Sequence, residues 1–320
     1  MKALIQTDKK LIMDEKRPII SIIILNYNQI QVTCEFLEST KKLTYPNYEI
    51  ILVDNASKDD PTNTIRTKYP NVKLIVAEKN FGFTGGNNIG LLAAKGDYYF
   101  IVNNDTEVTA DLLERLLEPF SKDNTIGVVS PKIKYYSNPD TIQYAGFSEM
   151  NPFTGRGKTT GGKKIDNGDY DTGGYTAYAH GAAMLVKREV VEKVGMLPDI
   201  FFIYYEELDW SAHIRRAGYK IYYQPKGVIY HKESITMGKE SSIKAYYHTR
   251  NRILFMRRNT KTSQFFVFTL FLIFVIIPRS SFKYLVNGQF NHLKMFFQGV
   301  IWNLYTPKYS NQNLKYNIKS

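Results

Sequence analysis

Hydrophobic positions near the start of the chain form short continuous runs separated by polar, helix-like stretches. The runs are rich in β-branched residues, which is typical of strands buried on both faces of a parallel sheet. They cover residues 19–25, 49–53, 72–77 and 98–102, and helical patterns occur between them at about 31–42, 62–68 and 86–95. Strands that alternate with helices predict an α/β fold with a doubly wound, mostly parallel sheet.

The pattern changes twice further along the chain. Residues 132–178 are rich in Gly, Thr, Asn and Tyr, which predicts loops, short strands and a mobile flap over a site. Apolar periodicity returns at 182–186 and in a helix at 207–217. From about residue 244 the pattern is helical, with an uncharged apolar run closed by Pro278 and then an amphipathic helix. The apolar face of that helix is formed by Val286, Phe290, Leu293, Phe297, Val300 and Leu304, with Asn287, Asn291, Lys294 and Gln298 opposite.

Composition and charge divide the chain into three parts. With 320 residues, of which 43% are hydrophobic, the chain can bury a large core. Its net charge is +12, and residues 241–320 contain twelve Lys and Arg but no Asp or Glu. The cationic excess therefore lies wholly in the last quarter. We predict an N-terminal extension (1–17), a main domain (18–243) and a basic, amphipathic helical C-terminal region (244–320).

The N-terminus and the cysteine content indicate the compartment. The N-terminal extension is charged and lacks the apolar core of a secretion signal. The single cysteine, Cys34, excludes an intrachain disulfide and fits a reducing compartment, where it is expected to be a small buried side chain. We therefore expect a cytoplasmic protein.

Polar clusters follow several predicted strands, at the edge of the sheet where ligands of such folds bind. Asp54 ends the second strand, and its carboxylate would accept the N3–H of uracil or thymine, or else cap the next turn. The segment from Asn80 to Gly90 is rich in glycine. Its backbone amides would approach a phosphate or a sugar ahead of a helix N-terminus, or form only a tight turn.

A third cluster, Asn103–Asn104–Asp105, follows another buried strand. A diphosphate leaving group needs a hard divalent cation, which binds carboxylate and phosphate oxygens. Asp105 would supply the carboxylate, and His231, at the end of a later apolar run, would be a further ligand. The simpler interpretations are a turn rich in Asn and Asp and a structural histidine.

An acidic cluster, Glu206, Glu207 and Asp209, begins a predicted helix. The helix dipole favours acidic residues there, but carboxylates so close together also repel and can raise the pKa of one of them. A raised pKa is what a general base needs to take a proton from a hydroxyl. Four aromatic residues precede the cluster and would form a wall for a sugar or a core patch: Phe201, Phe202, Tyr204 and Tyr205.

In order and spacing, these segments resemble the family 2 glycosyltransferases, which have the glycosyltransferase-A fold. The resemblance is closest to the rhamnosyltransferase-like branch of bacterial polysaccharide assembly. It covers about residues 18–258 and makes the main domain the catalytic one. The matching segments are 21–28, 53–57, 80–90, 103–105, 180–182, 206–209 with 215–219, 231 and 250–252.

The resemblance implies an inverting, metal-dependent transfer of a sugar in one in-line displacement. Asp105 and His231 would hold Mn²⁺ or Mg²⁺, and Glu207 would be the catalytic base. Two positions depart from the family pattern. Asn103 replaces the first Asp of the usual Asp-x-Asp motif, and Glu207 stands where Asp is commoner, which leaves Asp209 as an alternative catalytic residue.

The expected donor is a nucleotide sugar, dTDP-rhamnose or a UDP-hexose, and the expected acceptor is a hydroxyl of a glycan or lipid-linked glycan in cell-surface polysaccharide synthesis. The expected donor-binding residues are Asn26, Asn28, Asp54, Asn80, Gly82, Phe83, Gly86, Asn87 and Asn104. The expected acceptor-binding residues are Tyr205 and Glu206.

Two other classes of protein fit part of the pattern. A non-catalytic nucleotide-sugar-binding or tethering protein fits the single carboxylate of the metal motif, but it would have no use for the acidic cluster and His231. A nucleotidyltransferase would need a basic activating loop near the N-terminus, which residues 27–29 do not supply.

The basic C-terminal region is expected to lie on an anionic membrane surface on the cytoplasmic side without crossing the membrane. The apolar run 265–277 has thirteen residues, fewer than the ~20 that a helical span needs. In the alternative, its apolar face packs on the catalytic domain or on a second subunit in a homodimer. Nucleic acid is not expected as a partner, because the uncharged run would then face nothing useful.

Overall fold

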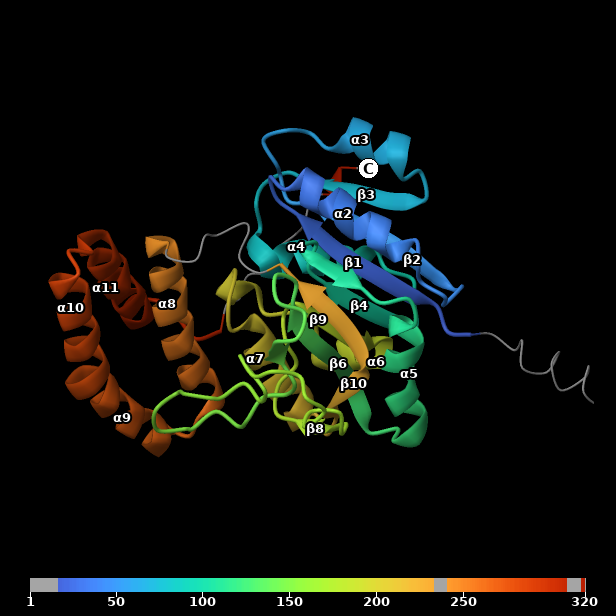
Figure 1. Ribbon diagram of the computed structural model, residues 1–320. Coiled ribbons are helices and arrows are strands. Elements are labelled where there is room, and N and C mark those ends of the chain that lie inside the picture. The colour runs from blue at the N-terminus through green and yellow to red at the C-terminus, as the bar shows by residue number, and fades with distance from the viewer. Residues whose placement is uncertain (1–16, 233–240, 310–317, 320) are drawn as a thin grey trace, which may run out of the picture.

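The computed structural model describes residues 17–232, 241–309 and 318–319. The predicted N-terminal extension therefore lies almost wholly outside the described residues. A twisted central sheet occupies the middle of the main domain, with helices on both faces and a separate group of helices beside it (Figure 1).

The strand order in the described part of the chain is β11-β3-β2-β1-β4-β9-β6-β10-β5, with β7 paired to β6 and β8 to β10. The strands are β1 (Ile20–Asn26), β2 (Tyr48–Asp54), β3 (Val72–Ala77), β4 (Tyr98–Val102), β5 (Thr106–Val108), β6 (Ile126–Tyr135), β7 (Ile142–Tyr144), β8 (Gly174–Thr176), β9 (Ala183–Lys187), β10 (Lys220–His231) and β11 (Ile318–Lys319). The four strands predicted near the start of the chain are present, each within one residue at either end.

The sheet is parallel in its first half and mixed in its second. β1 pairs in parallel with β2 and β4, and β2 pairs in parallel with β3. β9 runs antiparallel between β4 and β6, and β10 is parallel to β6. The predicted α/β class is confirmed. A parallel pairing of β6 with β9 would need a crossover connection, usually a helix, and no helix lies between these two strands in the described chain.

Helices cover both faces of the sheet. On one face lie α2 (Ile30–Thr40), α3 (Thr62–Lys68) and α5 (Leu112–Lys122); on the other lie α4 (Gly82–Ala93), α6 (Arg188–Val194) and α7 (Glu206–Arg216). Alternate side chains of β1 divide between the two cores. Ile22 and Ile24 pack with the first set, and Ile23 packs with the second. This burial on both faces explains the continuous apolar runs of the sequence.

The C-terminal region forms a group of helices beside the sheet (Figure 1). They are α8 (Ser242–Asn259), α9 (Thr262–Phe271), α10 (Ile277–Val286) and α11 (Phe290–Tyr305). α11 packs closely along α8 because Gly299 has no Cβ, and a Cβ there would lie 2.8 Å from the carbonyl oxygen of Tyr246. Asn303 of α11 also donates a hydrogen bond to the carbonyl oxygen of Arg250 on α8, at 2.9 Å.

The helix that contains the apolar run continues past Pro278, so the prediction that this proline closes it is wrong. A π-helical segment, Leu272–Ile276, joins α9 to α10 in one helix, Thr262–Val286. In a regular α-helix the ring of Pro278 would clash with a preceding carbonyl group, and the wider π-turn relieves that clash. The joined helix has 25 residues, and its most apolar 18-residue window has a mean hydropathy of 2.1, enough by length and composition alone to cross a membrane.

Most of this helix is exposed. Only 17% of its most apolar window is buried, and Phe274, for example, is 73% exposed. The predicted apolar face of the last helix is partly exposed as well, at Phe290, Phe297 and Leu304. The side of α11 that packs on α8 is instead centred on Phe296, Gly299 and Asn303. Many apolar side chains of these helices therefore remain exposed and are not buried by packing on the main domain.

Candidate active site

A chain of polar side chains joins the ends of β1, β2 and β4. Asn26 donates to Asp54 at 2.6 Å and accepts a hydrogen bond from Thr33 at 2.8 Å. Thr33 accepts from Asn104 at 2.8 Å, and Ser57 donates its hydroxyl and its amide to Asp54. Asn26, Asp54 and Asn104 are thus brought together as predicted. Thr33 was missed because it lies outside the polar motifs, and Ser57 was noted only as part of the 53–57 segment, without a role of its own.

Asn28 forms the exposed rim of this network. Its backbone has a positive φ of 55°, a conformation that Asn tolerates better than most residues. Its side-chain oxygen accepts from the amide of Lys58, and its own amide donates to Ser57, both at 2.8 Å. Asp54 itself is only 1% exposed. Asn28 and Ser57 therefore present more surface to a nucleotide than Asp54 does.

For the glycine-rich segment the structure favours the second of the two predicted roles, a tight turn. Its amides are already bonded within the protein: Phe81 donates to Asn55, Gly82 to the side chain of Asn80, and Thr84 to the carbonyl oxygen of Phe202. Gly82 has a φ of +74°, and a Cβ there would lie 2.5 Å from Phe202. The segment is a tight connection against the loop that precedes α7, and these amides do not point to a phosphate site.

α4 begins at Gly82, four residues before the predicted start, so Gly86 and Asn87 lie inside the helix. Gly86 allows α4 to approach the sheet, because a Cβ there would lie 2.2 Å from Leu25. Asn87 is buried and donates to the carbonyl oxygen of Phe83 in its own helix, at 2.8 Å. Phe83 packs in the second core. For these residues a packing role fits the structure better than the predicted contact with the donor.

Asp105 and His231 face each other beyond the end of the sheet, with Oδ1 of Asp105 3.1 Å from Nε2 of His231. The other ring nitrogen, Nδ1, lies 2.8 Å from the side-chain oxygen of Gln143. Because that oxygen can only accept, Nδ1 carries a proton, and Nε2 is the ring nitrogen that faces Asp105. No sequence pattern pointed to Gln143, which lies on β7 in the segment expected to form loops and short strands.

A second histidine, His180, lies beside this pair, with its ring 6.4 Å from that of His231 between centroids. Its Nδ1 accepts a hydrogen bond from the amide of Ala182 at 3.0 Å. Burial, with a smaller contribution from His231, lowers the pKa of His180 to about 3, so it stays neutral. Among the described residues no group of three or more His, Cys, Asp and Glu side chains is arranged to hold a metal ion. Asp105 and His231 form a two-residue site.

The acidic cluster begins α7 close to this site. A Cβ on Gly181 would lie 3.7 Å from Glu207, and the neighbouring Ala182 accepts a hydrogen bond from the amide of Asn103 at 3.0 Å. Burial raises the pKa of Glu207 to about 7, and burial together with the charge of Glu207 raises the pKa of Glu206 well above its usual value. In the described part of the chain, Oε2 of each glutamate is buried without a hydrogen-bond partner.

The loop before the cluster has an unusual backbone that α8 holds in place. Phe202, Tyr204 and Tyr205 have φ values of 65°, 69° and 72°, which are unfavourable for bulky residues. The side-chain amide of Asn251 donates to the carbonyl oxygens of Phe201, Ile203 and Tyr204, and Arg250 donates to those of Ile200 and Phe201. The 250–252 motif therefore fixes the aromatic loop, a function that the sequence did not reveal.

Asp209 is unsuited to be the alternative base. It is fully buried, and its two oxygens accept from Nε and Nη2 of Arg258 at 2.9 and 2.8 Å. Asn259 donates to it as well, at 2.6 Å. A carboxylate held this firmly by a guanidinium is a structural anchor between α7 and α8. Its proximity to Glu207 in sequence is misleading, because the two side chains face different surroundings.

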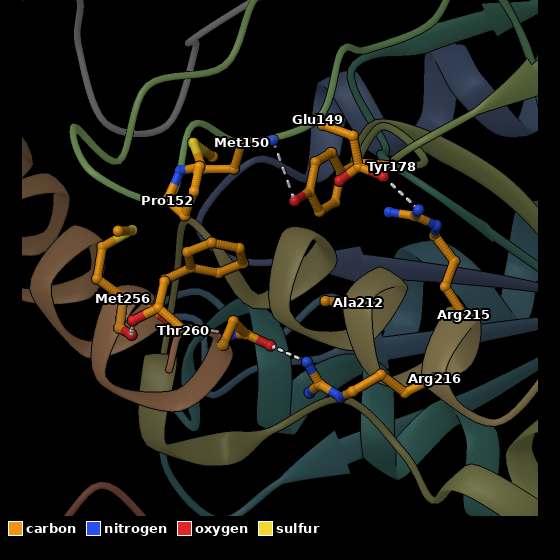
Figure 2. Close-up of a pocket in the computed structure, with 11 residues that line it drawn as sticks. Glu149, Met150, Pro152, Tyr178, Ala212, Arg215, Arg216, Met256 and Thr260 are labelled. Carbon is orange, nitrogen blue, oxygen red and sulfur yellow. Dashed lines mark hydrogen bonds and ion pairs between the residues drawn. The ribbon is translucent and has the colours of Figure 1, made fainter. Parts of the chain in front are cut away.

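Two pockets flank α7. One, of about 380 Å³, is lined by Phe147, Met150, Gly155, Arg156, Gly157, Tyr204, Tyr205, Glu207, Leu208, His248 and Arg252. It brings the 132–178 segment over the acidic cluster, as expected of a flap. The other, of about 270 Å³, lies between α7, α8 and residues 149–152 (Figure 2). Its arginines are engaged, Arg215 with Glu149 and Arg216 with Asn259.

The fold and site define a glycosyltransferase of the glycosyltransferase-A type. The model of the family described as Glycosyl transferase family 2 matches residues 21–195, more than half of the chain. The chain belongs to this family, and the predicted family and fold are confirmed.

Several curated proteins are similar in sequence. The uncharacterized protein y4gI of Sinorhizobium fredii is 28% identical over 268 residues, which cover 78% of this chain and 28% of that protein, so the chain spans little more than a quarter of this relative. N-acetylglucosaminyl-diphospho-decaprenol L-rhamnosyltransferase of Mycobacterium tuberculosis is 22% identical over 247 residues, which cover 69% of this chain and 78% of the relative. The expected rhamnosyltransferase-like resemblance is thus found.

Solved structures share the fold. GalNAc-T7 with UDP, GalNAc and Mn²⁺ has a TM-score of 0.57 and 18% identity, over 75% of this chain and 52% of that one. The mannosyltransferase PcManGT from Pyrobaculum calidifontis, in complex with GDP-Man and Mn²⁺, has a TM-score of 0.56 and 15% identity, over 95% of this chain and 94% of that one.

Proposed function

We propose that this glycosyltransferase is metal-dependent and inverting, and that it transfers a sugar from a nucleotide sugar to a hydroxyl of a glycan or lipid-linked glycan. The observation that carries the proposal is the placement of Glu207, a buried carboxyl with a raised pKa, against Gly181, which follows His180, whose ring lies 6.4 Å from that of His231. A base for the acceptor and a pair of metal ligands for the leaving group are the two parts that such a displacement needs.

The Asp105–His231 pair fits a divalent cation. Adjacent ligands of an octahedral ion with bonds of about 2.1 Å lie about 3 Å apart, and Oδ1 and Nε2 are 3.1 Å apart. A carboxylate oxygen and an imidazole nitrogen, which converge here, are both types of ligand that Mn²⁺ and Mg²⁺ accept. When bound, the ion would neutralise charge on the diphosphate of the donor, whose oxygens would complete the coordination.

Glu207 would take the proton of the acceptor hydroxyl. The freed oxygen then forms a bond to the anomeric carbon of the donor sugar. The bond from that carbon to the diphosphate oxygen breaks, and the nucleoside diphosphate leaves with the electron pair. One displacement of this kind inverts the anomeric carbon, and no covalent sugar–enzyme intermediate forms.

The donor is expected to be dTDP-rhamnose or a UDP-hexose. The polar network of Asn28, Asp54 and Ser57 at the end of β2 and the similarity to a mycobacterial rhamnosyltransferase support this expectation. A screen of UDP-, dTDP- and GDP-sugars for thermal protection and slow hydrolysis, with and without Mn²⁺, tests it. Protection by one pyrimidine sugar only when Mn²⁺ is present is the expected result. No protection by any nucleotide sugar would instead indicate that the chain does not use one.

We also propose that the C-terminal helices attach the enzyme to an anionic membrane surface on the cytoplasmic side. α9 and α10 expose large apolar side chains, and the basic residues nearby include Lys261, Arg279 and Lys283. Although the helix is long enough to cross, α10 is followed by α11, which returns to pack on α8. Crossing would separate α11 from α8 and break the Asn303–Arg250 bond, so a peripheral position is favoured.

Vesicle sedimentation tests this attachment. The full chain should pellet with anionic vesicles at low salt and release partly as salt rises. The double variant Phe266→Asp, Phe274→Asp, which changes only exposed positions, should stay in solution. Resistance of membrane-bound protein to alkaline carbonate would indicate a spanning helix. Equal behaviour of the variant and the parent would favour an interface with a second subunit.

A further inference from the structure

The pocket that holds Glu207 also contains two arginines from opposite walls. Arg252 comes from α8, and Arg156 comes from the flap. The two guanidinium groups line the same pocket and both lie over rings of α9, Arg252 over Phe268 and Arg156 over Phe271. Burial lowers the pKa of Arg252; Tyr205 opposes this shift and the positive charge of Arg156 adds to it. Like charges are rarely brought together at a pocket unless an anion offsets their repulsion.

Neither arginine makes an ion pair within the described part of the chain. Arg252 donates to the carbonyl oxygen of Thr154, but its Nε is buried and has no partner among the described residues. The two other well-buried arginines of α8 differ, because Arg250 is bonded to the aromatic loop and Arg258 to Asp209. Arg252 therefore retains a donor for a ligand, and a buried donor without an acceptor is costly.

The arginine end of the pocket adjoins the apolar surface of α9. The guanidinium of Arg252 lies 6.0 Å from the ring centre of Phe268, and that of Arg156 lies 5.5 Å from the ring centre of Phe271. The flap meets the same helix at Gly155, where a Cβ would lie 3.1 Å from Phe268. Along the pocket the lining changes from a carboxyl base to two cations, and these meet aromatic side chains of α9, the helix that also exposes Phe266 and Leu270.

We propose that this pocket binds the phosphoryl group of a lipid-linked acceptor between Arg156 and Arg252, with the acceptor sugar toward Glu207 and the lipid chain along α9. The proposal rests on the proposed function and names the acceptor class for the same site. Guanidinium groups bind phosphate oxygens in pairs, and an isoprenoid chain would cover the apolar surface of α9. The donor diphosphate would lie elsewhere, at Asp105 and His231.

Binding of farnesyl diphosphate, measured by calorimetry with the full chain, tests the proposal. Farnesol and inorganic pyrophosphate serve as the neutral and the headgroup-only probes. The parent should bind farnesyl diphosphate more tightly than either. Arg156→Ala and Arg252→Gln should each weaken that binding about 10- to 100-fold while farnesol binding is unchanged. Lys158→Ala, which removes a nearby exposed cation of the same flap, is the matched control and should bind normally.

One further variant, Asp105→Ala, separates the possible results. If Asp105→Ala abolishes farnesyl diphosphate binding and the arginine variants do not, the diphosphate occupies the donor site and the proposal is overturned. Arg156→Ala changes an exposed side chain, so its result stands even if Arg252→Gln disturbs folding. The proposed function is tested separately by donor hydrolysis. Normal hydrolysis in the arginine variants, with farnesyl diphosphate binding unchanged as well, would refute the phosphoryl site alone.

Discussion

Glu207→Gln tests the assignment of the catalytic base most directly. The pKa of Glu207 in the parent is raised from 4.5 to about 7, which corresponds to about 3 kcal/mol in favour of the neutral carboxyl. The carboxylate form is the active one, so kcat/KM of the parent should rise about tenfold per pH unit below pH 7 and level off above it. Glutamine keeps the shape but cannot take a proton. Transfer should fall by on the order of 10²–10⁴-fold, and the dependence on this ionisation should disappear.

The assay is the initial rate of transfer between pH 5 and 9, with donor affinity measured in parallel as a check on folding. Glu206→Gln is the control. The pKa of Glu207 is raised by its own burial, and Glu206 stays neutral because burial and the charge of Glu207 raise its pKa well above the usual value, so the midpoint near pH 7 should stay in place even if the rate changes. A midpoint near 4.5 in the parent, or turnover of Glu207→Gln within tenfold of the parent, would refute the reasoning.

Stability gives an independent measure of the same ionisation. A carboxyl whose pKa is raised in the folded state contributes stability below its unfolded pKa, and this contribution is lost as pH rises to the folded pKa. The parent should therefore lose stability between about pH 4.5 and 7 relative to Glu207→Gln. The variant should melt at a higher temperature than the parent at pH 8, and the gap should narrow toward pH 4.5. An equal gap at both pH values would contradict a raised pKa.

Three other predictions concern the metal pair and the anchor of α7. EDTA should abolish transfer, and Asp105→Ala or His231→Ala should prevent tight Mn²⁺ binding in calorimetry; full activity in EDTA would exclude the metal-dependent mechanism. Gln143→Leu should weaken Mn²⁺ about 10- to 100-fold, because the ring of His231 loses the partner that fixes its proton on Nδ1, whereas Gln143→Glu, which keeps an acceptor, should bind Mn²⁺ nearly as the parent does. Asp209→Ala should lower the free energy of unfolding in urea by about 3–5 kcal/mol, because Arg258 is left buried without its partner, and adding Arg258→Met should recover part of the loss; a loss below about 1 kcal/mol would show that the pair is not an anchor.

The sequence predicted the parts of the fold that depend on local pattern. The β-branched runs placed β1 to β4 because strands buried on both faces have no polar positions to interrupt them. Local pattern was misleading at Pro278, where a π-helical segment lets the helix continue. It was also misleading at Gly86, where the glycine allows α4 to pack against Leu25. Residue type alone does not separate a glycine that meets a ligand from one that meets a side chain.

The candidate site was predictable where two residues end neighbouring strands. Asp105 and His231 meet because β5 and β10 are paired, and Asn26 meets Asp54 because β1 and β2 are in register there. The contributions of α8 were not predictable, because Asn251 and Arg252 reach the site from a helix whose position depends on tertiary packing. The role of Asp209 depended on the same helix, through Arg258.

The hydrogen bonds that Asn251 donates to the aromatic loop before α7 limit how the enzyme could be re-engineered for a new lipid. Exchanging the terminal helices between relatives is an obvious route to a different membrane preference. A fusion joined before α8 would separate three carbonyl groups from the amide that holds them, and the aromatic loop would be free to relax. A fusion joined after Asn259 would keep this brace together with the anchor of Asp209. The fusion point for such chimeras should therefore lie at residues 260–261, between α8 and α9.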